Sequence, residues 1–216
     1  PVKLDTLTID IGASSKAEAE KYVSPGDCAY FRSDYTEPGN GYLREKALDD
    51  RIGCAIMVDI LNKDLPYDVT CVFTVQEEIG TRGAKVAAYT VKPDYAIVLE
   101  TTTACDFSGN DGEKRVCELG KGCVVSYMDR STIYDRELYR LGFEKAKEIG
   151  VPCQTKTLVA GGNDSGAIHS SVGGIRTVAL SVPCRYLHSP SCMIKKSDVQ
   201  STAELAYAMY LALAEK

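Results

Sequence analysis

Acidic residues and one of only two histidines stand at four expected strand or loop ends in the sequence. They are Asp49 and Asp50 in LDDRIG, Glu77 and Glu78 in VFTVQEEIG, Glu100 in AIVLETT, and His188 in RYLHSP. Carboxylate oxygens and imidazole nitrogens, without pairs of thiolates, are ligands that suit zinc, cobalt or manganese at a hydrolytic site. The sequence therefore predicts a metal centre if the fold brings these four segments together.

Each acidic pair also has an interpretation that involves no metal. Glu77 and Glu78 could form a polar cap where a strand leads into a helix, and Asp49 and Asp50 could cap a helix and stabilise its first turn. Alternation along a strand, however, sends neighbouring side chains to opposite sides, so two consecutive glutamates cannot both be surface residues of one face. Both interpretations stay open for each pair alone, whereas the four segments together favour the metal centre.

The composition limits the class of protein. A chain of 216 residues, 44% hydrophobic and 25% charged, can bury one substantial core. A net charge of -5, without Lys/Arg runs, argues against nucleic acid as a partner. The apolar stretches are too short to span a membrane and no signal-peptide pattern opens the sequence, so we expect a cytoplasmic protein without a membrane partner. Nine cysteines without CxxC spacing predict reduced thiols, with a Cys/His nucleophile as the alternative.

Strand and helix signals alternate from residue 47 onward. Strands are expected at residues 69–75, 95–99, 122–127, 155–159 and 177–182, and helices at residues 50–62, 82–90, 134–149, 164–171 and 199–214. This alternation predicts an α/β fold with an open mixed sheet and helices on both faces. Ligands of such sheets bind beyond the carboxyl ends of the strands, where the acidic residues stand.

The first 45 residues have a different pattern. Strands are expected at residues 7–11, 28–32 and 42–46, with a loop rich in glycine and proline at 37–41. Ser15 and Glu18 have the spacing of a capping box and predict a short helix. These residues form a small β-rich part that has too few apolar positions for a core of its own.

Six segments of the chain, in their order, resemble one family of enzymes. They are IDIGASSKAEAE, KALDDRIGCA, VFTVQEEIGTRGA, VLETTTACD, GGNDSGAIH and PCRYLHSP, and together they extend over nearly the whole sequence. The family is that of the co-catalytic metallo-aminopeptidases, which includes glutamyl aminopeptidase, the tetrahedral aminopeptidases and proteins labelled cellulase M or endoglucanase. The resemblance implies a zinc-peptidase-like fold and two divalent metal ions, either zinc or cobalt or else manganese. It also implies short peptides as substrates and a homo-oligomer, a dimer or a dodecamer.

The resemblance further implies a role for each residue of the expected metal centre. Asp49 would bridge the two metal ions. Glu78 and His188 would complete the protein ligands of one ion, and Glu100 would bind the other. Glu77 would be the general base that takes a proton from the attacking water.

Three more residues are implied to lie behind the ligands or beside the substrate, namely Asp50, Asp164 and His169. Relatives with two consecutive aspartates at the bridging position often have a cis peptide bond between them. We therefore expect a cis bond between Asp49 and Asp50.

One part of the family pattern is not found in this sequence. The family has a further histidine ligand in an HxD-type segment upstream of a small inserted domain. Residues 1–45 are accordingly expected to be the C-terminal part of that β-rich dimerisation domain, and residues 46–216 the catalytic domain without its N-terminal portion. The ion bound by Asp49 and Glu100 is left with two protein ligands, so at most one well-occupied metal and little peptidase activity are expected of the chain as it stands.

Two classes of function follow. The first is a metal-dependent aminopeptidase, which hydrolyses N-terminal residues from short peptides with a water activated by two metal ions and a glutamate base. The alternative is a metal-poor scaffold or binding protein that has the same fold without turnover. Glycan hydrolysis, which only the cellulase label suggests, requires paired acids but neither His188 nor a bridging aspartate.

Overall fold

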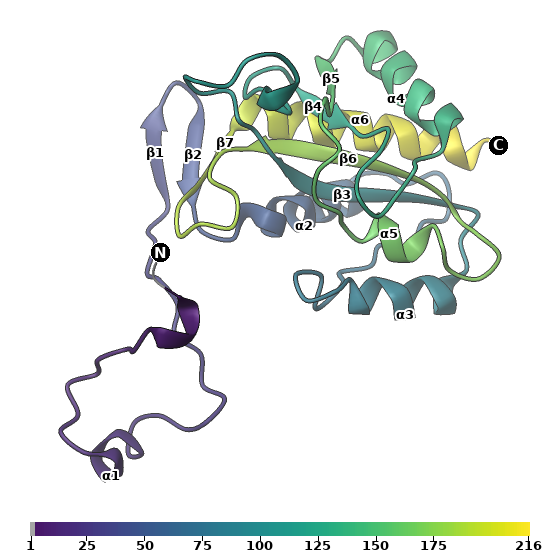
Figure 1. Ribbon diagram of the computed structural model, residues 1–216. Coiled ribbons are helices and arrows are strands. Elements are labelled where there is room, and N and C mark those ends of the chain that lie inside the picture. Colours follow the sequence, from purple (N-terminus) through teal and green to yellow (C-terminus); the bar gives the residue numbers. More distant parts are fainter. Residues whose placement is uncertain (1–2) are drawn as a thin grey trace. The chain divides into compact units, whose positions relative to one another are not determined.

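The computed structural model describes residues 3–216, which divide into two compact units (Figure 1). The first unit ends at Arg32 and the second is Ser33–Lys216. The helices of the first unit are η1 (Leu4–Thr6), a 3-10 helix, and α1 (Lys16–Ala19).

The N-terminus of α1 is capped as the sequence predicts. Ser15 Oγ accepts a hydrogen bond from the Glu18 N–H at 3.2 Å, and the Glu18 carboxylate accepts one from the Ser14 N–H at 2.9 Å. The strands predicted at residues 7–11 and 28–32 are wrong, because neither stretch is a strand. An alternating pattern favours extended backbone, but only a neighbouring strand can supply the hydrogen bonds that make it a strand.

A small antiparallel sheet in the second unit has the strand order β1-β2-β7. Its strands are β1 (Thr36–Gly39), β2 (Tyr42–Glu45) and β7 (Cys192–Lys195). β2 confirms the strand predicted at 42–46, whereas β1 lies mostly in the predicted loop and β7 is absent from the predicted strands. Asn40 and Gly41 have φ of 53° and 76°, which is the left-handed pair that a tight hairpin turn requires. The glycine-rich signal therefore belongs to a hairpin.

β2 pairs with β7, which is close to the end of the chain. Leu43 faces Ile194 and Glu45 faces Cys192 in this ladder. The pairing makes the β1–β2 hairpin part of the larger unit, so the two compact units meet in the sequence at Arg32, before the predicted domain boundary at residue 45. The assignment of residues 1–45 to an inserted dimerisation domain stays a prediction.

The main sheet is open and mixed, with the order β3-β6-β4-β5. Its strands are β3 (Tyr95–Thr103), β4 (Cys123–Val125), β5 (Cys153–Thr155) and β6 (Arg176–Cys184). β6 runs parallel to β3 and antiparallel to β4, and β5 runs parallel to β4. The expectation of an α/β fold with an open mixed sheet is confirmed. β5 begins two residues before its predicted start, and the chain after it is a loop.

Five helices follow the predicted positions closely. They are α2 (Leu48–Leu61), α3 (Arg82–Val91), α4 (Arg136–Ile149), α5 (Ser165–Ile168) and α6 (Lys196–Ala214), with the 3-10 helix η2 (Gly112–Arg115) as an addition. α4 shows why the helix ends could be predicted from the sequence. At its start, Asp135 Oδ1 accepts hydrogen bonds from the N–H groups of Glu137 and Leu138, at 2.9 and 3.0 Å. At its end, Gly150 has the left-handed φ of 76° that terminates a helix. α5 is shorter than its predicted span.

The core lies between β6 and the helices that pack on the sheet. Val178, Leu180 and Val182 alternate along β6, are fully buried, and belong to one cluster with residues of α2, α4 and α6. Ala179 points to the other side of the sheet and packs with Val98 and with residues near α5. Because β6 is buried on both faces, it reads as a continuous apolar run.

Residues 69–75 do not form the predicted strand. The stretch enters none of the strand pairs between the residues that the structure describes. Its sequence, VTCVFTV, has strong strand propensity, but the described residues place no partner beside it. The stretch nevertheless brings Glu77 and Glu78 to the start of α3.

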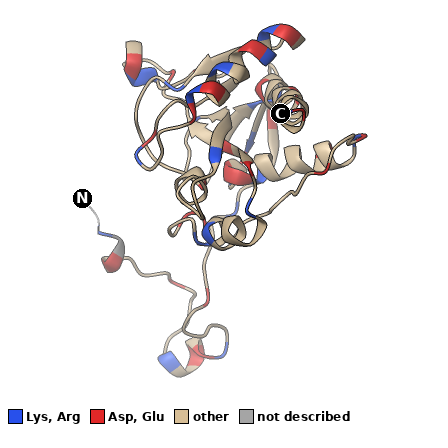
Figure 2. Cartoon of the chain, turned by 90° about the vertical axis from the view of Figure 1, so that its right-hand side faces the viewer, with Lys and Arg blue, Asp and Glu red and all other residues tan. Residues whose placement is uncertain are grey.

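Charged residues are spread over many elements. Figure 2 shows the lysines and arginines interspersed with acidic residues on helices and loops rather than gathered along one element. Within residues 3–216, no helix is both long enough and apolar enough to cross a membrane.

Candidate metal centre

Asp49, Glu78 and His188 come together although they stand on three separate parts of the chain. His188 Nε2 lies 3.1 Å from Asp49 Oδ2 and 3.3 Å from Glu78 Oε2. One ligand atom from each residue lies within 4.8 Å of the other two, a spacing that one metal ion can span. Carboxylate oxygens and imidazole nitrogens are both ligands that zinc accepts, and catalytic zinc sites have three protein ligands. The structure thus brings together the three residues that the sequence assigns to one ion.

The backbone around these residues is unusual in each case. Asp49 opens α2, and its peptide bond to Asp50 is cis, as predicted. His188, in the loop between β6 and β7, has φ 58°, and Gln76, just before the acidic pair, has φ 60°. Left-handed backbone is uncommon for residues other than glycine and is often found at functional sites, where the surrounding structure enforces it.

An ion pair that the sequence analysis missed holds the base of the His188 loop. Arg185 Nε lies 2.5 Å from Asp106 Oδ1, and Arg185 Nη2 donates to Asp106 Oδ2 at 2.9 Å. The backbone of Arg185 also exchanges hydrogen bonds with Met193 of β7, at 2.9 and 3.0 Å. Asp106 follows β3, far from Arg185 in the sequence, so no local pattern connects the two. The only feature of the sequence that could have indicated this ion pair is Arg185 itself, three residues before His188.

A second group of ligand atoms shares Asp49 with the first. Asp49, Asp50 and Glu100 each offer a carboxylate oxygen within 4.8 Å of the others. The sequence analysis expects only Asp49 and Glu100 as ligands here, and Asp50 brings a third carboxylate oxygen within reach. Which of the three bind an ion stays a prediction. Asp50 accepts a hydrogen bond from the Gly53 N–H at 3.1 Å, and a Cβ atom at Gly53 would overlap its carboxylate.

These carboxyl groups strongly disfavour further negative charge. Burial raises the pKa of Asp50 to about 8, although the hydrogen bond from the Gly53 N–H acts to lower it. The negative charges of Asp49 and Glu77 raise it further. Burial also raises the pKa of Glu100 well above its usual range, together with the charge of Asp50. Buried carboxylates that repel each other are stabilised when a cation lies between them. The donor atoms therefore fit divalent cations.

Glu77 lies next to the ligand groups but belongs to neither of them. Its side chain is half-buried, and burial raises its pKa to about 7, with smaller contributions from the charges of Asp164 and Glu78. A glutamate that titrates near neutral pH can accept and return a proton during a reaction. The carbonyl of Glu77 also accepts hydrogen bonds from the N–H groups of Gly80 and Thr81, at 3.0 and 2.9 Å, which fix the turn.

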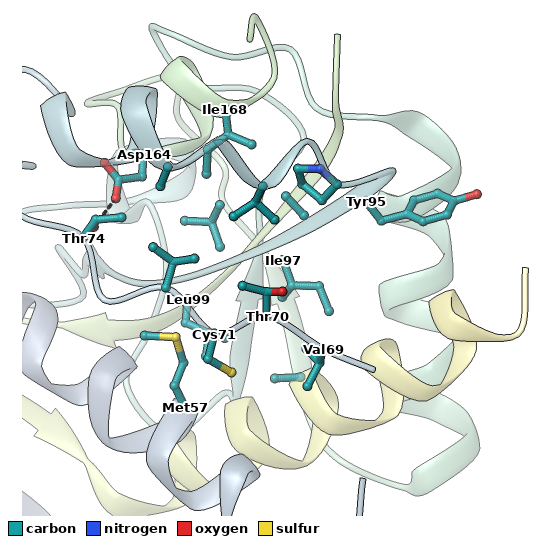
Figure 3. Close-up of a pocket in the computed structure, with 18 of the residues that line it drawn as sticks. Met57, Val69, Thr70, Cys71, Thr74, Tyr95, Ile97, Leu99, Asp164 and Ile168 are labelled. Atoms are coloured by element: carbon teal, nitrogen blue, oxygen red, sulfur yellow. Dashed lines mark hydrogen bonds between the residues drawn. The ribbon is translucent and has the colours of Figure 1, made fainter. Parts of the chain in front are cut away.

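Asp164 is buried beside a large cavity and has one carboxylate oxygen without a partner. Thr74 Oγ1 donates to Asp164 Oδ2 at 2.6 Å, as Figure 3 shows, and Asp164 Oδ1 has no hydrogen-bond partner among the described residues. The loop before it is held by Asn163, whose Oδ1 accepts from the Ser165 N–H at 2.8 Å. Tyr134 in turn contacts Asn163, with 3.2 Å from Asn163 Nδ2 to the Tyr134 hydroxyl. Thr74 and Tyr134 were not singled out in the sequence.

His169 lies apart from both ligand groups. Its Nδ1 is 2.8 Å from the carbonyl oxygen of Ser165, one turn earlier. The side chain lines a separate small cavity together with Asp135 and Arg176. Its expected position behind the ligands or beside the substrate stays a prediction.

Known proteins show the same fold. An aminopeptidase from the archaeon Desulfurococcus kamchatkensis superposes with a TM-score of 0.89 at 30% identity, over 96% of this chain and 61% of its own. A TET aminopeptidase from a marine sediment archaeon of the Thaumarchaeota gives a TM-score of 0.88 at 33% identity, over 93% of this chain and 58% of its own.

The sequence comparisons agree with the structural ones. A relative from Acetivibrio thermocellus is 41% identical over 208 residues, 94% of this chain and 62% of its own length. The lysyl aminopeptidase of Pyrococcus furiosus is 34% identical over 209 residues, 95% of this chain and 59% of its own. The chain thus spans about 60% of the length of the curated relatives that it matches. Residues 1–205 match the sequence pattern of the M42 glutamyl aminopeptidase family, and the chain therefore belongs to that family.

Proposed function

We propose that this chain provides most of the catalytic site of a metal-dependent aminopeptidase, which hydrolyses the N-terminal residue from short peptides. The observation that carries the proposal is that Asp49 is common to two groups of ligand atoms. A carboxylate has two oxygens and can bind two ions at once, and paired ions are typical of aminopeptidases. Family membership supports the same conclusion.

The two groups would hold one ion each. Asp49, Glu78 and His188 would bind one divalent ion, and Asp49 with Glu100 and Asp50 would bind the other. The group with an imidazole suits zinc or cobalt, and the group with oxygens alone also suits manganese. When bound, such ions polarise a peptide carbonyl and make water a stronger nucleophile at neutral pH.

Glu77 is the proposed general base. Its carboxylate would take a proton from the attacking water and pass it to the nitrogen of the leaving amine. A side chain that was itself a ligand could not move protons freely, and Glu77 is in neither ligand group. Asp164, fixed by Thr74, would face the substrate side of the same carboxylates.

The test is hydrolysis of aminoacyl-p-nitroanilides and short peptides by the purified chain, alone and together with the remaining part of a longer relative, with zinc, cobalt or manganese added in turn. Bound metal is measured in the same samples. Glu77→Gln keeps the shape of the side chain, so we expect unchanged metal content and a turnover lowered by about 10² to 10⁴. Glu215→Gln, near the C-terminus, is the matched control. Normal turnover of the Glu77 variant contradicts the proposed base.

The same assay separates the proposal from a binding function. Tight metal binding without any release of amino acids by the unchanged chain, alone and in the presence of the remaining part of a longer relative, favours a non-catalytic scaffold. Turnover that rises with bound metal favours the enzyme.

Assembly and location are proposed only by analogy. A similar solved structure, a Pyrococcus horikoshii TET1 peptidase with a TM-score of 0.80 at 32% identity, is described as assembling into a tetrahedron or a large octahedral shell. We propose a homo-oligomer for this protein, which light scattering of the purified protein would measure. A cytoplasmic location stays a prediction.

A further inference from the structure

Two buried cysteines stand at the two ends of the loop that carries His188. Cys184 is the last residue of β6 and Cys192 is the first residue of β7, and their exposed fractions are 0% and 1%. Both are free thiols in the structure. Buried cysteines often act only as small apolar residues, so burial alone assigns these two no further role.

The sulfur atoms of the two residues are in contact with each other. The Cys184 thiol donates a hydrogen bond to the Cys192 sulfur. Beside them the backbone of Arg185 is paired with that of Met193 through N–H to carbonyl hydrogen bonds of 2.9 and 3.0 Å. Antiparallel residues paired in this way have Cα atoms about 5.5 Å apart. The contact between the sulfurs and the paired backbone beside them give the closeness that a disulfide requires.

The His188 loop itself covers Cys192. Cys192 Sγ lies 3.5 Å from the carbonyl oxygen of Tyr186 and 3.7 Å from that of Ser189. The side chain of Tyr186 is 53% exposed, and His188 is exposed as well. On this side the backbone of a single loop therefore lies between the sulfur and exposed side chains. A local opening of that loop, without unfolding of the core, brings Cys192 within reach of a small reagent.

The two sulfurs differ in reactivity. The hydrogen bond from Cys184 lowers the pKa of Cys192 to about 6, although burial acts to raise it. The same hydrogen bond raises the pKa of Cys184, and burial raises it further. Because the thiolate is the nucleophilic form of cysteine, Cys192 is the sulfur that reacts first and Cys184 the one that reacts with the product.

We propose that Cys184 and Cys192 are an oxidation site, a dithiol whose disulfide closes the base of the His188 loop. The disulfide joins residues 184 and 192 covalently, so that the loop stays fixed at both ends. Neither cysteine is a candidate metal ligand or the candidate base, and the inference therefore goes beyond the proposed activity.

The oxidant is a hydroperoxide such as hydrogen peroxide, which is small enough to reach a sulfur under a loop. The Cys192 thiolate attacks one peroxide oxygen, the O–O bond breaks, and the sulfur becomes a sulfenic acid while the leaving hydroxide takes up a proton to give water. Cys184 then loses its proton and attacks the Cys192 sulfur. The S–O bond breaks with release of a second water, and the disulfide forms. Two thiols are oxidised in this sequence, and one peroxide is reduced to two waters.

Trypsin provides a direct test, because cleavage after Arg176, Arg185 and Lys195 places the two cysteines on separate peptides. The full chain is treated with hydrogen peroxide, the remaining thiols are blocked with N-ethylmaleimide, and the peptides are identified by mass spectrometry. We expect peptides 177–185 and 186–195 to be joined with the loss of two hydrogens, and dithiothreitol to separate them. Their link should form in at least about tenfold higher yield than a link between any other cysteines of the chain.

Variants test the order of the two steps. In Cys184→Ser the reaction should stop at the sulfenic acid of Cys192, which dimedone labels. In Cys192→Ser the thiol of Cys184 should stay unlabelled. Cys153→Ser removes a half-buried cysteine of β5, away from the His188 loop, and is the matched control that should retain the link. The measurement on the unchanged chain decides the proposal even where a variant is unstable.

Thermal unfolding tests the closure of the loop. Oxidation should raise the melting temperature of the unchanged chain, because a covalent ring constrains the unfolded state. The same treatment of Cys184→Ser, which cannot form the link, corrects for oxidation elsewhere in the chain.

Three results would overturn the proposal. One is the absence of the joined peptides after treatment with peroxide, or a yield no higher than that of links between other cysteines. Another is dimedone labelling of Cys184 in the Cys192 variant without labelling of Cys192 in the Cys184 variant, which reverses the assigned roles. The third is a melting temperature that oxidation leaves unchanged or lowers relative to the Cys184 variant, which excludes a closing role for the disulfide.

Discussion

The ion pair between Arg185 and Asp106 should be essential for the loop that carries His188. Asp106 is 5% exposed and Arg185 is 23% exposed, and their two contacts measure 2.5 and 2.9 Å. Removal of one partner from a buried pair costs about 3–5 kcal/mol, because the other charge stays buried. The partial exposure of Arg185 and the hydrogen bond that Asp106 accepts from the Leu119 N–H, at 2.9 Å, reduce this penalty. We therefore expect Arg185→Met to lower the free energy of unfolding by about 2–3 kcal/mol.

Urea unfolding of four proteins measures this coupling. They are the unchanged chain, Arg185→Met, Asp106→Asn and the double variant. The double variant buries no unpaired charge. Its loss of unfolding free energy should therefore be smaller, by about 1–2 kcal/mol, than the sum of the losses in the two single variants. Arg176→Met is the matched control, since it removes an arginine that is 38% exposed and should cost about 1 kcal/mol or less. A loss at Arg185 no larger than that of the control would refute the reasoning.

The pH dependence of the same measurement has a defined sign. Burial raises the pKa of Asp106, but the hydrogen bonds from Arg185 and Leu119 and the charge of Arg185 outweigh it, so the pKa lies below its ordinary value. A lowered folded pKa contributes stability that is complete above the unfolded pKa of about 4 and is lost as the pH falls through the folded pKa. The difference between the unchanged chain and Arg185→Met should therefore be full above about pH 5 and should shrink in more acidic solution. A difference independent of pH would exclude the ion pair as its cause.

Three other changes have expected outcomes. His188→Asn should abolish tight zinc binding in calorimetry but retain the fold, because asparagine tolerates the left-handed φ of 58°; undiminished affinity would remove His188 from the ligands. Gly53→Ala should lower the free energy of unfolding by about 1–3 kcal/mol in urea, because the added carbon overlaps Asp50. The added carbon of Gly173→Ala meets open space, so this control variant should leave the free energy of unfolding unchanged. Equal losses in the Gly53 and Gly173 variants would show that the structure relieves the overlap with Asp50. Tyr134→Phe removes a hydroxyl that donates at 2.6 Å to a buried carboxylate, and should lower the melting temperature through a loss of about 1–3 kcal/mol; an unchanged melting temperature would contradict this.

The positions of the candidate ligands could be predicted because each stands at a strand or loop end that local patterns mark. Glu100 follows the apolar part of β3, the pair at 49–50 stands in the first turn of α2, and the pair at 77–78 stands in the turn before α3. The cis bond at Asp49 was predicted from the resemblance to a family, not from propensity, and it is confirmed. Local patterns also placed most helices, since α4 has both a capping aspartate and a terminal glycine.

What could not be predicted depends on contacts between distant parts of the chain. β7 has only four residues and is a strand because β2 pairs with it. The same reason makes residues 69–75 a wrong prediction, since their sequence favours a strand but none of residues 3–216 pairs with them as one. The closeness of the Asp50 carboxylate to those of Asp49 and Glu100 could not be predicted, because a sequence shows which residues are adjacent but not where a side chain reaches.

The ladder between β2 and β7 also determines when the candidate metal centre can form during folding. Asp49 stands just after β2 and His188 just before β7, so these two residues meet only when a loop that contains most of the larger unit has closed. Closure of a loop has an entropic penalty that grows slowly with its length, but the contact itself forms late because most of the chain must already be arranged. Binding of a metal to this pair would then report that the loop between them has closed.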